Sequence, residues 1–107
     1  MSVNLIYITA ENIDEARTVG KALVRERLVA CVNIIDNVNS MFWWEGTVRD
    51  EKEVIIIAKT REELVPEVIA RVKSLHSYEV PCVVSLPILD GYKPFLDWVR
   101  NETGKDE

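Results

Sequence analysis

The chain has 107 residues, of which 48% are hydrophobic, and its formal net charge is −5. This length predicts a single domain over residues 1–107, and the hydrophobic content excludes a disordered chain. The acidic charge argues against a nucleic-acid-binding face, and no apolar run approaches the roughly 20 residues that span a membrane. We therefore expect a globular protein with neither nucleic-acid nor membrane partners.

The N-terminal third predicts a strand, a helix and a second strand. Leu5–Thr9 is a short apolar run, as expected for a strand. Asn12 followed by Glu15 resembles a capping box, and an apolar stripe then predicts an amphipathic helix over Ile13–Arg27. Leu28–Ile35 is almost continuously apolar, which predicts a strand that is buried on both faces.

The middle of the chain predicts two further strands. A turn at Asp36-Asn37 precedes an aromatic strand over Asn39–Val48, in which Gly46 suggests a bulge or bend. The charged stretch Arg49–Lys52 predicts a solvent-exposed turn. Glu53–Lys59 has the β-branched composition of a central strand.

The last third predicts a helix, a strand and a short final helix. The second apolar stripe begins near Glu63, because Pro66 must lie in the first turn of its helix, and that helix should end by Ser77. Cys82–Leu89 predicts a strand, and Pro94 is well placed to begin the last helix.

These elements predict an α+β fold, a ferredoxin-like βαβ–βαβ sandwich with a long β-hairpin and an extra C-terminal helix. Right-handed crossovers place the first two helices on one face of an antiparallel sheet. The hairpin, from Ile34 to Ala58, is longer than this fold requires. Its unpaired edges would be covered by other copies of the chain in a closed cyclic assembly.

His76 and the two cysteines are the soft metal-ligand candidates. His76, the only histidine, follows the second predicted helix, where it could cap that helix or bind a metal. One histidine cannot build a zinc site alone, and neither Cys31 nor Cys82 has the spacing of a metal-binding pair. No secretory leader precedes the first predicted strand, so we expect reduced, buried thiols in the cytoplasm.

Other candidate residues lie near the predicted strand ends. Trp43 and Trp44 are adjacent and should face opposite sides of a strand, one of them toward a pocket or a partner. The candidate carboxylates are Glu45, Glu51, Glu53 and Glu79, with solvated surface charges as the simpler interpretation. Lys59 ends a strand before a helix, a common ligand position, although a lysine extending into solvent is the alternative.

Five segments, spread in this order from Leu28 to Val99, together resemble the CutA family of divalent-cation tolerance proteins. They are LVACVNI (Leu28–Ile34), FWWEG (Phe42–Gly46), EVIIIAKT (Glu53–Thr60), LHSYEVP (Leu75–Pro81) and FLDWV (Phe95–Val99). The resemblance implies a cytoplasmic homotrimer of ferredoxin-like subunits with a genetic link to copper and other divalent metals. It implies no established reaction, so an enzyme is not expected.

The family's copper ligands are only partly present. The resemblance places two of the copper-ligand positions at Ile8 and Leu75, which have no ligand atoms, and only His76 remains as a candidate. Ser77 also stands where the family commonly has proline. Replacing two soft or borderline ligands by apolar side chains should weaken copper affinity strongly.

Three functional hypotheses follow. The first is a trimeric binding or signalling scaffold whose intersubunit clefts are lined by Trp44, Glu45, Lys59, His76, Tyr78 and Glu79. The second is a small-molecule enzyme that uses such a cleft with His76 as its base. An RNA-binding ferredoxin-like domain is the third, and the acidic charge argues against it.

Overall fold

The computed structural model describes residues 2–104; Met1 and residues 105–107, which the predicted domain includes, lie outside the described residues. The chain runs through β1 (Val3–Ala10), α1 (Ile13–Arg25), β2 (Cys31–Trp44), β3 (Thr47–Arg61), a 3-10 turn (Glu62–Leu64), α2 (Val65–Leu75), β4 (Val83–Pro87) and α3 (Lys93–Glu102). The four strands form one antiparallel sheet in the order β2-β3-β1-β4. This confirms the predicted ferredoxin-like fold.

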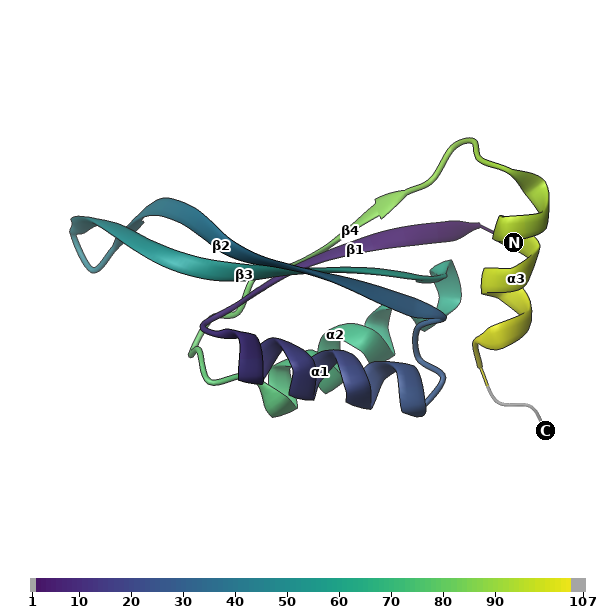
Figure 1. Ribbon diagram of the computed structural model, residues 1–107, viewed down its shortest axis with the longest axis horizontal. Coiled ribbons are helices and arrows are strands. Elements are labelled where there is room, and N and C mark those ends of the chain that lie inside the picture. Colours follow the sequence, from purple (N-terminus) through teal and green to yellow (C-terminus); the bar gives the residue numbers. More distant parts are fainter. Residues whose placement is uncertain (1, 105–107) are drawn as a thin grey trace.

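Helices α1 and α2 cover the same face of the sheet, as predicted, and α3 lies at one end of it (Figure 1). The α1 helix begins where the sequence indicated, because the Asn12 side chain accepts a hydrogen bond from the Glu15 N–H at 2.8 Å. The core lies between these helices and the sheet, and its largest fully buried side chains include Ile6, Ile8, Ile56, Val19, Leu23, Val68 and Val72. No helix among residues 2–104 is both long and apolar enough to cross a membrane.

The hairpin of β2 and β3 extends beyond the rest of the sheet. Pairing between β1 and β3 stops at Ala10 and Val54, whereas β2 and β3 stay paired as far as Trp44 and Thr47. We call residues 38–53 the hairpin arm. It projects from the sheet at the end opposite α3 (Figure 1).

The turn predicted at Arg49–Lys52 is wrong, because these residues lie within β3. The chain reverses instead at Glu45-Gly46, where φ is 51° and 82°. Two positive φ values in a two-residue loop are typical of a tight hairpin turn. Both faces of a projecting arm can meet solvent, so a strand there does not need alternating apolar residues. For this reason the run of charged residues was wrongly predicted to be a turn.

Two further predictions about β2 are also corrected. The turn at Asp36-Asn37 is a bulge inside the strand, where the register shifts between Ile35 and Val38 and Asn37 has φ 64°. The strand begins at Cys31 and lies at the sheet edge, so it is not buried on both faces. Val32 and Ile34 pack against the core on one face, whereas Ile35 on the other face is 45% exposed.

The sheet face that α1 and α2 leave uncovered is also apolar. Cross-strand pairs of Tyr7 with Ile57 and of Tyr7 with Val84 lie on this face. We call it the open sheet face, and its apolar side chains are Leu5, Tyr7, Ile55, Ile57, Val84 and Leu86, all half-buried or exposed. Contiguous apolar side chains on an uncovered face are typical of surfaces that contact another protein.

Candidate functional site

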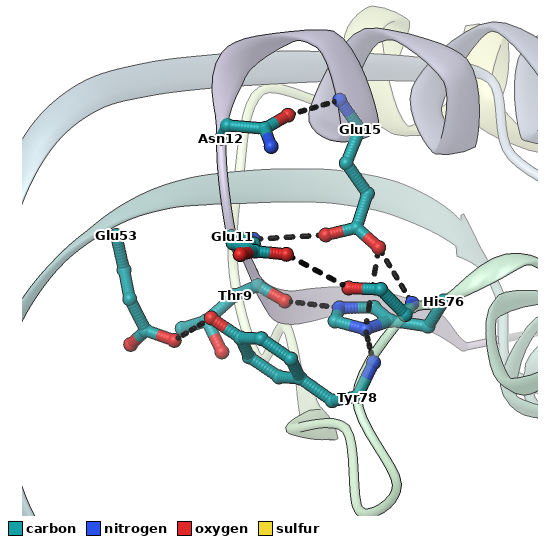
Figure 2. Close-up of polar contacts among 8 residues, drawn as sticks. Thr9, Glu11, Asn12, Glu15, Glu53, His76 and Tyr78 are labelled. Carbon is teal, nitrogen blue, oxygen red and sulfur yellow. Dashed lines mark hydrogen bonds and ion pairs between the residues drawn. The ribbon is translucent and has the colours of Figure 1, made fainter.

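His76 lies at the C-terminal end of α2, in extended backbone, and its side chain has no exposed surface. Its Nε2 lies 2.6 Å from the carbonyl oxygen of Thr9, and its Nδ1 accepts a hydrogen bond from the Tyr78 N–H at 3.1 Å (Figure 2). These two contacts fit the tautomer in which Nε2 donates and Nδ1 accepts. The ring therefore joins the end of β1 to the segment that follows α2.

Glu15 extends this network to the start of α1. Its carboxylate accepts hydrogen bonds from the backbone N–H groups of Glu11 at 2.9 Å and Ser77 at 2.6 Å, and it lies 3.7 Å from Nδ1 of His76 (Figure 2). Burial raises the pKa of the Glu15 carboxyl, but the hydrogen bonds from Glu11 and Ser77 outweigh burial, so the pKa falls below its ordinary value. The capping-box glutamate thus also holds the segment after α2.

We expect Glu15→Gln to lower the free energy of unfolding at pH 7 by about 1–3 kcal/mol, because hydrogen bonds to a charged group are lost. The folded pKa lies below the unfolded value, so this stabilisation is complete above the unfolded pKa and disappears as the pH falls through the folded pKa. Urea denaturation should therefore show a smaller difference from wild type at pH 3 than at pH 7. Glu45→Gln, at the exposed hairpin loop, is the control, and an equal difference at both pH values would contradict the assignment.

Tyr78 connects the buried histidine to the hairpin arm. Its hydroxyl donates a hydrogen bond to Oε2 of Glu53 at 2.7 Å, and its ring lies 4.7 Å from the His76 ring between centroids. Burial, the hydrogen bond to Glu53 and the negative charge of that carboxylate raise the pKa of Tyr78 far above 10. The hydroxyl therefore stays protonated, and it ties the segment after α2 to the base of the arm.

A cavity of about 530 Å³ lies between the hairpin arm and residues 78–82. We call it the arm cavity. Its lining includes the aromatic side chains of Phe42, Trp44 and Tyr78, the carboxylates of Glu51, Glu53 and Glu79, and the guanidinium of Arg49. The cavity combines an apolar wall with several charged groups, which is the usual composition of a small-molecule site.

The structure brings together three of the predicted site residues, since Trp44, Tyr78 and Glu79 all line the arm cavity. Glu45 lies apart at the exposed hairpin loop, and Lys59 hydrogen-bonds to the Asn33 side chain on the sheet. His76 is packed against Tyr78 and does not line the cavity.

The two adjacent tryptophans have different surroundings. Trp43 is 74% exposed, whereas Trp44 is half-buried and lines the arm cavity. This difference follows from the alternation of side chains along a strand.

Sequence reasoning named the carboxylates of this cavity as candidates but did not group them with Arg49 at one site. Arg49 and Glu51 were assigned to a turn, and Glu53 was interpreted as a solvated carboxylate, although it is only 8% exposed. Arg49, Glu51 and Glu53 alternate along the sequence, so in a continuous strand they share one face. This spacing could have indicated that their side chains lie together. The spacing was not used because Arg49–Lys52 was predicted to be a turn.

The side chains of this subunit do not fit a metal site. Among residues 2–104, no group of three His, Cys, Asp or Glu side chains could hold one ion. Both ring nitrogens of His76 are already engaged, so a metal would have to displace Thr9 or Tyr78. Burial and the charge of Glu53 raise the pKa of the Cys82 thiol, which disfavours the thiolate that binds metals. His76 as a metal ligand stays a prediction.

Comparison with known proteins gives consistent matches over the chain. The family model described as CutA1 divalent ion tolerance protein matches residues 4–102. A divalent-cation tolerance protein CutA from Thermus thermophilus is 44% identical over 100 residues, which cover 94% of this chain and 97% of that protein. The crystal structure of CutA1 from Oryza sativa has a TM-score of 0.95 at 36% identity and covers 99% of this chain and 97% of that chain. A structure from Archaeoglobus fulgidus, described as a periplasmic divalent cation tolerance protein CutA, has a TM-score of 0.91 at 45% identity and covers 94% and 97%.

Proposed function

The chain belongs to the CutA1 family of divalent ion tolerance proteins. From this premise we propose that it is a homotrimeric, cytoplasmic binding or signalling protein. In this proposal the arm cavity opens into a cleft between subunits. The family is named for tolerance of divalent cations and not for a reaction. The proposed activity is therefore recognition of a ligand, which the assembly transmits to a partner.

The open sheet face is the observation that carries the proposal. Its apolar side chains, Tyr7 and Ile57 among them, have no covering helix within the subunit, and burying them would stabilise an assembly. The two sheet edges also differ, since β2 forms one and β4 the other. Contact between two different surfaces of identical subunits gives a closed ring when the rotation closes.

Light scattering tests the assembly directly. We expect a mass about three times that of the 12.3 kDa chain at micromolar concentration. Leu86→Glu, on the open sheet face, should shift the protein to smaller species, because a charge would be buried in the interface. Ile69→Glu on α2 is a matched control, since Ile69 and Leu86 are 42% and 49% exposed. A monomeric wild type, or equal effects of both variants, would contradict the trimer.

The cytoplasmic setting is supported by the cysteines. Cys31 and Cys82 are both free thiols, as is usual in a reducing compartment. The Archaeoglobus fulgidus relative is described as periplasmic, so expression of a tagged chain followed by fractionation is the appropriate test.

Divalent metals enter the proposal only through the family. Copper or another divalent cation stays a predicted ligand, because no group of three donor side chains among residues 2–104 could hold one ion. Calorimetric titration with Cu(II), Zn(II) and Mg(II) on wild type and His76→Ala addresses this point.

The alternative, a small-molecule enzyme with His76 as its base, has no support in the geometry. A general base must lie within hydrogen-bond reach of the proton that it removes. The His76 ring has no exposed surface and does not line the arm cavity.

A further inference from the structure

The arm cavity has an excess of negative charge. Among the described residues, three carboxylates line it, and Arg49 is the only cationic side chain in the lining. Nη1 of Arg49 lies 3.8 Å from Glu51, whereas within residues 2–104 neither Glu53 nor Glu79 forms an ion pair. The cavity should therefore repel anions and attract cations.

Glu53 is the most buried charged group of this cavity. The residue is 8% exposed, and its Oε2 accepts the Tyr78 hydroxyl. Its other oxygen, Oε1, receives no hydrogen bond from the described residues and is not fully buried, so a group in the cavity can reach it. A cationic donor placed in the cavity would therefore meet this oxygen in a charge-assisted hydrogen bond, which is stronger than one between neutral groups.

The remaining wall is aromatic and apolar. Phe42, Trp44 and Tyr78 contribute rings, and Met41 and Val80 contribute aliphatic surface. The faces of aromatic rings attract cations, most strongly where water is excluded. The same surface favours a ligand with an apolar body.

These features distinguish between two kinds of cation. A bare metal ion needs several ligand atoms around one point, and the described carboxylates are not grouped in this way. An organic ammonium ion can be held by one carboxylate, with ring faces or water beside its other N–H groups and an apolar wall beside its body. We propose that the arm cavity binds an organic ammonium ion, with the ammonium at Glu53 and the apolar body against Trp44 and Phe42. This inference rests on the proposed binding role of the cavity but not on the trimer.

Phenethylamine, which is an ammonium ion at pH 7, is a suitable probe. Phenylacetate and 2-phenylethanol are its controls, since they have the same ring with an anionic or a neutral head. In calorimetric titrations of the full chain we expect phenethylamine to bind about tenfold or more tightly than either control, because its N–H groups meet a charged acceptor. Equal or tighter binding of phenylacetate or 2-phenylethanol, or no binding of phenethylamine, would overturn the inference.

Variants locate the binding site. Glu53→Gln should weaken phenethylamine binding about tenfold, and Glu79→Gln, at an exposed position, should weaken it about threefold by removing a nearby charge. Glu45→Gln removes an exposed carboxylate outside the cavity and should change the affinity less than about twofold. If Glu53→Gln does not fold, the phenethylamine affinities of Glu79→Gln and Glu45→Gln still test the proposed site. Equal effects of these two variants would refute the proposed site.

Light scattering on the same samples separates this inference from the proposed function. A trimer that does not bind phenethylamine refutes only the ligand class. A monomer that binds it through Glu53 refutes only the trimer.

Discussion

Replacing His76 by alanine is expected to lower the free energy of unfolding by about 3–5 kcal/mol, measured by urea denaturation at pH 7 in the presence of EDTA. The imidazole has no exposed surface, so its removal leaves a cavity. The Thr9 carbonyl and the Tyr78 N–H also lose their hydrogen-bond partner, and an unsatisfied buried group costs about 1–3 kcal/mol. Both effects act on the folded chain without any metal.

His76→Gln is the informative second variant, because its amide can donate to Thr9 and accept from Tyr78. We expect it to recover about half of the lost stability. A side chain that served only as a metal ligand would behave differently. In EDTA neither substitution would then change the stability, and that result would exclude the structural role assigned to His76.

The helices could be predicted because their signals are local. The capping pair Asn12 and Glu15 and the apolar stripes on α1 and α2 reflect contacts with a single core, so the sequence pattern and the burial agree. The position of Pro66 likewise marked the beginning of α2. These features depend on residues within a few turns of one another.

The hairpin arm was harder to predict because its environment is not local. Side chains on the arm have solvent or a cavity beside them, so Arg49 and Glu51 occupy a strand without the alternation that identifies one. Glu45-Gly46 reverses the chain through positive φ values, and glutamate gives little indication of such a conformation. The turn was therefore predicted at the charged residues Arg49–Lys52 instead.

The candidate site was predicted only in part, for a similar reason. Trp44, Tyr78 and Glu79 were identified from aromatic character and position. The role of Glu53 depends on its contact with Tyr78, 25 residues further along the chain, and the role of Glu15 depends on Ser77, 62 residues away. Such pairings arise only when the sheet and α2 are assembled.

Adjacent isoleucines in β3 provide the strongest test of how the two sheet faces are buried. Ile56 lies in the core with no exposed surface, whereas Ile57 lies on the open sheet face. Ile56→Ala should lower the free energy of unfolding by about 2–5 kcal/mol at every protein concentration, because a cavity forms within the subunit. Thermal denaturation over a hundredfold range of protein concentration measures this.

Ile57→Ala removes the same groups one residue further along the strand, and its effect depends on the assembly. In a trimer the neighbouring subunits bury Ile57, so the variant should dissociate at higher protein concentrations than wild type and melt earlier on dilution. In an isolated subunit Ile57 stays half-buried, and the loss should be well below that of Ile56→Ala and independent of concentration. The second outcome would show that the open sheet face has no partner, and the proposed cleft between subunits would then lack its second wall.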